Sequence, residues 1–249
     1  MSQYKHDLNF LINFSNFSNY RKRFNMPGGT ENMFYSFNMG PVHFIGFSSE
    51  FYYFLNYGMK SLVNQFEWLE KDLIEANKPE NRKLRPWIIT FAHRPMYCSN
   101  ENGDDCTHSQ TLLRVGLPFC KFFALEPLFY KYGVDMEFWA HEHSYERLWP
   151  LYDYKVMNGS YDEPYRNPKA PVHIITGSAG NKEGREPFKK NIQPWSAIHS
   201  QDYGYTQMFV HNASHLEFKQ ISMDKEGDVI DHFFVIKDSH GAYANMDDL

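Results

Sequence analysis

The sequence predicts an α/β fold in which helices pack on mixed sheets, and three observations predict it. Between residues 35 and 141, short apolar runs alternate with helical segments, which is the order typical of a parallel sheet. After residue 170, strands alternate with tight turns, which indicates antiparallel pairing. The chain of 249 residues is 42% hydrophobic, enough to bury the core of one layered domain without a linker.

A hairpin and a helix are predicted before residue 80. Residues 1–30 are polar and are expected to be irregular. Two apolar segments, 35–37 and 42–47, flank a turn and predict a pair of strands. The helix is predicted by apolar residues that recur every three or four positions, and Pro79 marks its end. These apolar residues are Leu62, Val63, Phe66, Leu69, Leu73 and Ile74.

Two strands that each lead to histidine are predicted in the middle of the chain. Residues 86–92 form the first strand and end at His93, and residues 134–139 form the second and lead to His141. A loop and a helix around 122–132 separate them. This order implies a parallel pair with a right-handed crossover, so both histidine-bearing ends lie on one edge of the sheet.

The remainder of the chain is predicted to be mostly antiparallel. Short strands bounded by turn residues recur from residue 170 to residue 240. The strands are expected at 172–176, 205–211, 215–222 and 229–236, with turns at 212–214 and 224–228.

Three histidines at the strand ends are candidate metal ligands. A single histidine after a strand more often has a structural role, but His93 and the pair His141 and His143 repeat the same context. Loops at the carboxyl ends of strands are where α/β folds place such residues. Neutral imidazole binds zinc, iron and manganese, so the pattern favours a metal site.

Composition excludes several classes of protein. The net charge of −5 gives no basic face, so no nucleic-acid partner is expected. No run approaches the roughly 20 apolar residues that span a bilayer, so no membrane span is expected. Residues 1–7 do not have the pattern of a signal peptide.

Other features are typical of exported proteins. Cys98 and Cys106 lie in one polar loop, where a disulfide would close a small ring worth about 2–3 kcal/mol; two free surface thiols are the alternative. Cys120 is left unpaired in either case. Four short acceptor patterns for N-glycosylation occur, at Asn13, Asn16, Asn158 and Asn212.

Three longer motifs surround the strand ends. They are Trp-Ile-Ile-Thr-Phe-Ala-His-Arg-Pro-Met-Tyr at 87–97, Ala-His-Glu-His-Ser-Tyr-Glu-Arg at 140–147 and Ile-Ile-Thr-Gly-Ser-Ala-Gly-Asn at 174–181. Together they resemble motifs of the purple acid phosphatases, metallophosphoesterases with a dinuclear centre, and in particular their long-form animal branch. The resemblance implies a layered metallophosphoesterase β-sandwich flanked by helices, with mixed sheets and its N-terminal part missing. Residues 1–249 would be the C-terminal two-thirds, an incomplete catalytic domain whose region 170–240 is mostly antiparallel.

The resemblance also implies a role for each histidine. His93 and His141 would bind a divalent metal, zinc, manganese or iron, and His143 would bind Fe(III). The family supplies its other four ligands from the motifs Asp-x-Gly, Gly-Asp-x-x-Tyr and Gly-Asn-His-Glu, which precede the segment corresponding to residues 17–20, and none of these occurs in that part of the chain. The third motif would fall at residues 9–12, which read Asn-Phe-Leu-Ile. We therefore expect at most one bound metal.

Two functional hypotheses follow from this resemblance. In the first, the chain is part of a secreted or lysosomal acid phosphatase that hydrolyses phosphomonoesters, and it is inactive alone because ligands are missing. In the second, it is a truncated, non-catalytic homologue that acts as a binding or interaction protein. No catalytic side chain beyond the metal ligands is assigned.

Several neighbouring residues have expected structural roles. Glu142 is expected to face solvent, and Glu146 and Arg147 are expected to form a buried pair that supports the histidine loop. His108 and His199 are expected in loops within reach of a substrate. The remaining strand histidines are interpreted as ordinary strand positions, namely His43, His173, His211, His215 and His232.

Overall fold

A mixed sheet of seven strands organises the fold. The computed structural model describes residues 18–101, 103, 106, 111–118 and 121–243. The strand order is β1-β2-β3-β4-β8-β5-β9, in which β2, β3, β4 and β8 are parallel and the other three run antiparallel to their neighbours. The strands are β1 (Tyr35–Met39), β2 (Val42–Gly46), β3 (Trp87–Phe91), β4 (Met136–Trp139), β5 (Tyr145–Leu148), β8 (Val172–Thr176) and β9 (Ser196–Ser200).

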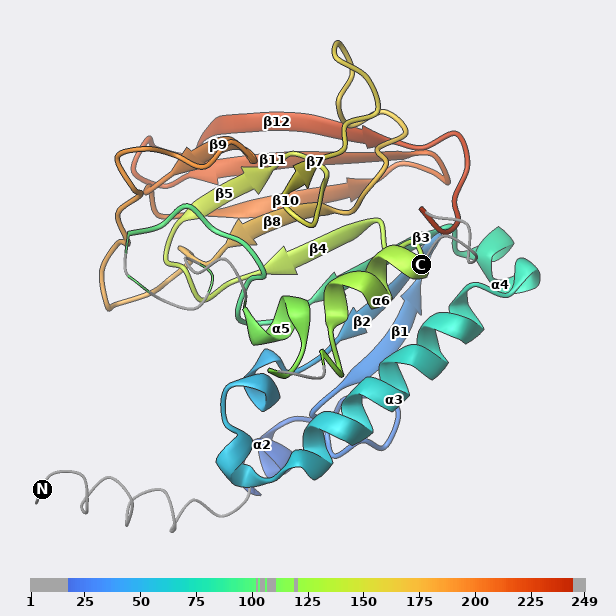
Figure 1. The fold of residues 1–249 in the computed structure, drawn as a ribbon. Helices are drawn as coiled ribbons and strands as arrows, with labels where there is room; N and C mark the ends of the chain where they lie inside the picture. The colour runs from blue at the N-terminus through green and yellow to red at the C-terminus, as the bar shows by residue number, and fades with distance from the viewer. Residues whose placement is uncertain (1–17, 102, 104–105, 107–110, 119–120, 244–249) are drawn as a thin grey trace, which may run out of the picture.

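A second, antiparallel sheet covers one face of the first (Figure 1). It contains β10 (Gly204–Val210), β11 (His215–Ser222) and β12 (Asp228–Ile236), which tight turns connect as the sequence predicts. A short hairpin of β6 (Leu151–Tyr152) and β7 (Lys155–Val156) stands apart. The two sheets bury a shared apolar layer, which includes Val42, Trp87, Ile89, Met136, Val172, Ile174, Leu216, Phe218, Phe233 and Val235.

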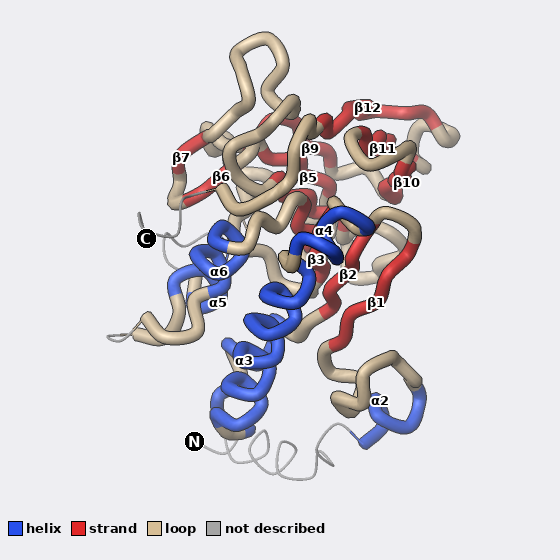
Figure 2. Tube along the Cα trace, turned by 90° about the vertical axis from the view of Figure 1, so that its right-hand side faces the viewer, coloured by secondary structure: helices blue, strands red, loops and turns tan. Residues whose placement is uncertain are grey.

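Helices cover the opposite face of the large sheet (Figure 2). The longest, α3 (Met59–Ala76), buries most of the predicted apolar stripe, with Leu62, Leu69 and Leu73 fully inaccessible, but Ile74 is 47% exposed. Pro79 follows the end of α3 and occupies the first turn of the next helix, where its missing N–H costs nothing. The shorter helical segments are α2 (Ser18–Arg23), η1 (Ser49–Tyr52), η2 (Leu55–Tyr57), α4 (Pro79–Leu84), α5 (Leu112–Val115) and α6 (Leu125–Lys131).

Two strands of the large sheet differ from the sequence prediction. The strand β5 reads Tyr-Glu-Arg-Leu and is buried on both faces, so it has neither the alternation nor the apolar run by which strands are recognised. The strand β9 is only partly buried. It contains His199, which therefore lies in a strand rather than a loop and packs its ring against Phe188 at 4.6 Å. His108 lies outside the described residues.

The predicted pair of Glu146 and Arg147 is wrong. Consecutive strand residues point to opposite faces, so the two side chains cannot meet. Arg147 instead contacts Asp231 of the second sheet through Nε at 2.7 Å and Nη2 at 2.9 Å, both buried. Glu146 accepts a hydrogen bond from the backbone N–H of Ser99 at 2.9 Å. Each residue thus fixes a different layer to β5.

No helix in the described part of the chain is long and apolar enough to cross a membrane. Of the possible glycosylation positions, Asn212 is exposed in the turn before β11, whereas Asn158 is half-buried with its Oδ1 atom inaccessible. Asn13 and Asn16 lie outside the described residues.

Candidate metal centre

The parallel pairing of β3 with β4 continues past the ends of both strands. Phe91 lies opposite Phe138, and the backbone N–H of Ala140 then donates to the carbonyl of His93 at 2.9 Å. This register places the residues after the two strands side by side at the carboxyl edge of the sheet. His93 and His141, 48 positions apart in the chain, meet there.

The imidazole rings of these two histidines are in direct contact. His93 Nε2 lies 2.9 Å from His141 Nδ1, and the ring centroids are 4.7 Å apart. His141 has a φ of 63°, in the left-handed region that residues other than glycine rarely adopt. Strained backbone of this kind concentrates at functional sites, where the surrounding structure holds it in place.

Arg94 decides the tautomers of the pair. Its Nη1 atom lies 3.0 Å from His141 Nε2, and a guanidinium can only donate, so this Nε2 accepts. His141 Nδ1 then carries the hydrogen and donates to His93 Nε2. Glu50 holds the guanidinium in place, since its Oε1 accepts from Arg94 Nε at 2.9 Å. One lone pair of each imidazole is therefore engaged in a hydrogen bond.

The environment of His93 favours its neutral form. Burial lowers the pKa of the imidazole, and the nearby ring of His141 lowers it further. Glu50 opposes the shift, and Arg94 and His143 add to it. Neutral imidazole is the form that binds metal, so the site is suited to ligation.

His143 has partners other than the two contacting histidines. Its backbone N–H donates to Glu186 Oε2 at 2.9 Å, and its ring Nε2 is 3.7 Å from Glu183 Oε2. In the part of the chain that the structure describes, no three His, Cys, Asp or Glu ligand atoms converge around His93 and His141. The three predicted ligands are therefore one close pair and one separate histidine.

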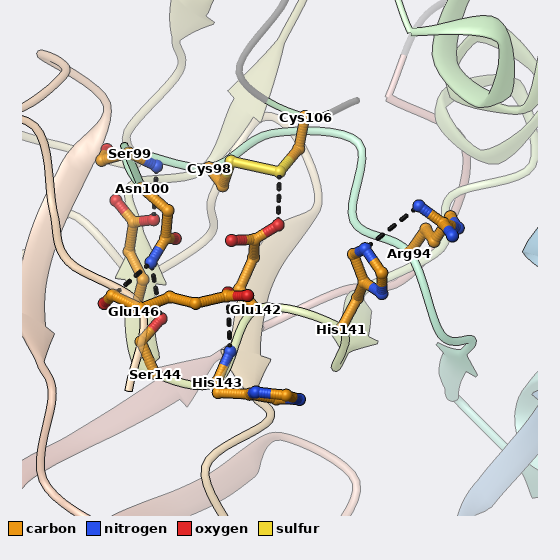
Figure 3. Close-up of a disulfide and its surroundings, with 11 residues drawn as sticks. Arg94, Cys98, Ser99, Asn100, Cys106, His141, Glu142, His143, Ser144 and Glu146 are labelled. Carbon is orange, nitrogen blue, oxygen red and sulfur yellow. Dashed lines mark hydrogen bonds between the residues drawn. A yellow bond between two sulfur atoms is a disulfide. The ribbon is translucent and has the colours of Figure 1, made fainter. Parts of the chain in front are cut away.

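Glu142 does not face solvent, contrary to the sequence expectation. It is fully buried, and Figure 3 shows its side chain pointing toward a disulfide that joins Cys98 to Cys106. The Oε1 atom lies 3.0 Å from Cys106 Sγ. These three residues bring their ligand atoms within 4.8 Å of one another, but sulfurs bonded to each other are not metal ligands.

Gly177, at the end of β8, supports the histidine loop from the other side. A Cβ atom on this glycine would lie 2.2 Å from the carbonyl oxygen of Glu142. Only glycine permits so close an approach of the two backbones. The loop is therefore held between β8 and the disulfide.

Sequence reasoning missed the polar residues around the histidines. Arg94 directly follows a predicted ligand, so its position in the motif was the available signal. Glu50 precedes β3 by many residues, and Glu183 and Glu186 lie in a loop after β8. No local pattern marks these three, because only the folded sheet brings them to the site.

With this geometry established, comparisons identify the family. Residues 6–145 match the calcineurin-like phosphoesterase family. The chain belongs to the calcineurin-like phosphoesterase family. Residues 170–232 match a second family, described as iron/zinc purple acid phosphatase-like protein C. The predicted resemblance to purple acid phosphatases is thereby confirmed, and this family implies a binuclear metal centre.

Vertebrate relatives of this phosphoesterase are similar over most of the chain. Acid phosphatase type 7 of Danio rerio is 59% identical over 92% of the chain and 52% of its own length. The proteins of the same name from Mus musculus and Homo sapiens are 55% and 54% identical, over 89% and 91% of the chain. The chain spans about half the length of these curated relatives: it covers 52% of the Danio rerio protein, 50% of the Mus musculus protein and 51% of the Homo sapiens protein.

Solved structures share the phosphoesterase fold. The purple acid phosphatase PPD1 from yellow lupin seeds superposes with a TM-score of 0.69 at 24% identity, covering 88% of this chain and 35% of its own. GAP50, the anchor in the inner membrane complex of Plasmodium, superposes with a TM-score of 0.52 at 19% identity, covering 86% of this chain and 54% of its own. These likenesses confirm the predicted layered α/β architecture.

Proposed function

We propose that residues 1–249 supply the histidine part of a binuclear centre in an acid phosphatase that hydrolyses phosphomonoesters. The observation that carries the proposal is the 2.9 Å contact of His93 with His141 at the ends of two parallel strands. The identity of 54–59% to animal acid phosphatases supports it and favours it over a non-catalytic binding module.

In this proposal, His93 and His141 hold a divalent metal, zinc, iron or manganese, and His143 holds Fe(III). The separation of His143 from the close pair agrees with ligands for two different ions. Metals in such a centre clamp phosphoryl oxygens and lower the pKa of bound water. Arg94 has to leave His141 Nε2, and His141 has to release His93 Nε2, before both nitrogens can bind an ion. Glu50 is placed to keep the guanidinium nearby.

The isolated chain is expected to be inactive. Three of the seven ligands that the resemblance implies are present, and two of these are in contact. One ion can be held by the pair together with solvent, so we expect at most one metal and no turnover.

The chain also carries features of an exported glycoprotein. The disulfide of Cys98 with Cys106 is of a kind that persists in oxidising compartments. Asn212 is exposed in an acceptor pattern. We therefore place the parent protein in a secreted or lysosomal compartment, with residues 1–249 forming one incomplete catalytic domain and 170–240 its mostly antiparallel region.

A metal titration and a chimera test the proposal together. Purified chain is titrated with zinc and assayed with a phosphomonoester; one ion at most and no turnover are expected. His93→Ala with His141→Ala should abolish the binding, whereas His211→Ala, at an exposed strand end, should not. In the chimera, residues 1–249 are joined to the part of the Danio rerio relative that this chain does not cover. This chimera should have phosphatase activity. An inactive chimera that binds two ions would contradict the proposal and support a non-catalytic role.

A further inference from the structure

A cluster of buried charges lies at the opposite edge of the sheet from the histidines, where β3 and β4 begin. Asp135 is completely buried, and its Oδ2 atom accepts from the backbone N–H of Ile88 at 2.8 Å. Lys237 donates to the other oxygen, and Arg82 Nη2 lies 3.5 Å from Oδ2. Burial opposes ionisation, but Lys237 and Arg82 hold the pKa of Asp135 well below its usual range.

This cluster contains one more positive than negative charge. Lys237 and Arg82 are both cations, and they share the single carboxylate of Asp135. The fourth member, His240, adds no negative charge; its Nδ1 lies 3.4 Å from Asp135 Oδ1 and its Nε2 contacts the carbonyl of Ala213 at 2.8 Å. A buried excess charge is costly unless a counter-charge reaches it.

The guanidinium of Arg82 is also incompletely hydrogen-bonded. The side chain is only 9% exposed, and its Nη2 donates to the carbonyl of Gly133 at 2.8 Å. Nε and Nη1 are buried and have no hydrogen-bond partner among the described residues. Water could satisfy these two donors, but it would not offset the charge.

A cleft of about 530 Å³ opens beside Arg82. Lys78, Lys131 and His240 also line it, and no acidic side chain does so among the described residues. Lys78 pairs with Glu75 at 2.6 Å, whereas Lys131 Nζ lies 5.0 Å from the ring centre of Tyr132. The cleft is therefore a positively charged, partly apolar recess, completed by Ile74, Asn77, Pro79, Tyr132, Gly241 and Ala242.

We propose that this cleft binds a small oxyanion of the phosphate class, with Arg82 as the buried donor and Lys131 as a second cation. Nε and Nη1 are the two guanidinium nitrogens left without a partner, since Nη2 is held by Gly133 and Asp135, and charge-assisted donors of this kind bind the oxygens of a tetrahedral anion. The chain advances six residues from Asp135 to His141, so the histidines lie about 20 Å away along the strands, at about 3.3 Å per residue. The anion site is thus separate from the metal centre and does not depend on the proposed activity.

Calorimetric titration of the full chain with inorganic phosphate tests the proposal. The protein carries His93→Ala and His141→Ala, so that the other site contributes no binding. Phosphate and sulfate are expected to bind, with acetate weaker and chloride weaker still. Lys131→Gln should weaken phosphate binding about fivefold, as for loss of one partly exposed charge. Lys60→Gln, which removes an exposed lysine of α3 outside the cleft, should leave it unchanged.

A second readout keeps the test independent of folding. The Arg82 Nε–H resonance in an ¹⁵N-labelled sample should shift on addition of phosphate and saturate with the calorimetric affinity. Arg82→Lys keeps the charge but loses the planar guanidinium donors, so it should weaken the binding of phosphate. Absence of phosphate binding, equal binding of chloride, or no effect of Lys131→Gln would overturn the proposal.

Discussion

Glu142 places its carboxylate 3.0 Å from the Sγ atom of Cys106, although its two chain neighbours are the candidate ligands His141 and His143. The disulfide and the histidine loop are therefore one packed unit. Because Glu142 is fully buried, a change at the disulfide is transmitted to the backbone that carries the ligands.

Removing the disulfide should weaken both the fold and the metal site. Cys98→Ser with Cys106→Ser is expected to lower the free energy of unfolding by about 2–3 kcal/mol, since the ring is short. Zinc affinity should fall in parallel, because the loop loses its support at Glu142. Urea unfolding and zinc titration measure the two effects, with Cys120→Ser as the control. Unchanged zinc affinity would show that the loop keeps its shape without the bridge.

Arg94 should compete with metal for His141. Its guanidinium donates to His141 Nε2 at 3.0 Å, so a metal has to displace this bond and approach a positive charge. Arg94→Gln is therefore expected to raise zinc affinity about tenfold, the effect of losing one charge-assisted bond of about 1.5 kcal/mol. Arg23→Gln, an exposed arginine, is the matched control. Weaker binding in Arg94→Gln would mean that the guanidinium supports the ligand instead of competing with the ion.

The contact between the sheets at Asp231 should be worth far more than a surface ion pair. Asp231 accepts from Arg147 at 2.7 and 2.9 Å and from the hydroxyl of Tyr145 at 2.7 Å. Asp231→Asn leaves a buried arginine without its counter-charge and is expected to cost about 3–5 kcal/mol of unfolding free energy.

An exposed pair of the same type is the control for Asp231. Asp238 lies 3.3 Å from Arg166 and is 60% exposed, so Asp238→Asn should cost less than about 1 kcal/mol. Chemical denaturation compares the two variants. Equal losses would show that the buried pair contributes no more than the exposed one.

Acid should destabilise the protein through His173. Burial lowers its pKa from 6.5 to about 3, so between these values the unfolded chain binds a proton that the folded chain excludes. The stability contribution is full above pH 6.5 and is lost as the pH falls toward 3, at up to about 1.4 kcal/mol per pH unit.

His173→Gln should flatten this part of the stability profile. Glutamine can still accept the hydrogen bond that Trp139 Nε1 donates at 3.2 Å, but it does not titrate. Glu137, whose Oε2 lies 3.5 Å from His173 Nδ1, remains in both proteins, and burial raises its pKa, so its own effect on stability has the opposite sign. Parallel slopes for both proteins between pH 6.5 and 3 would exclude His173 as the cause.

Apolar periodicity predicted the elements that bury apolar side chains. The stripe of α3 and the strands β3, β4 and β8 were found because their pattern matches their burial. In contrast, β5 was missed because two of its four buried residues, Glu146 and Arg147, are charged. Their hydrogen-bond partners, Ser99 and Asp231, are distant in sequence.

The candidate site was predictable to a similar degree. Strand order alone places His93 beside His141, and the structure agrees. The burial of Glu142 was not predictable, because it depends on a disulfide loop that packs against it from another part of the chain. Arg94 was overlooked for the same reason, since its contact with His141 exists only after β3 and β4 pair.

The close approach of Gly177 to the carbonyl of Glu142 affects how mutational scans of this protein should be interpreted. Any side chain at 177 would push the histidine loop away from β8, so every substitution there should score as a loss of function. Such a profile is easily mistaken for that of a residue that touches substrate. At Gly177 the profile would report only the spacing between two backbones. A histidine loop lengthened by one residue could therefore make substitutions at 177 tolerated without any change in the ligands.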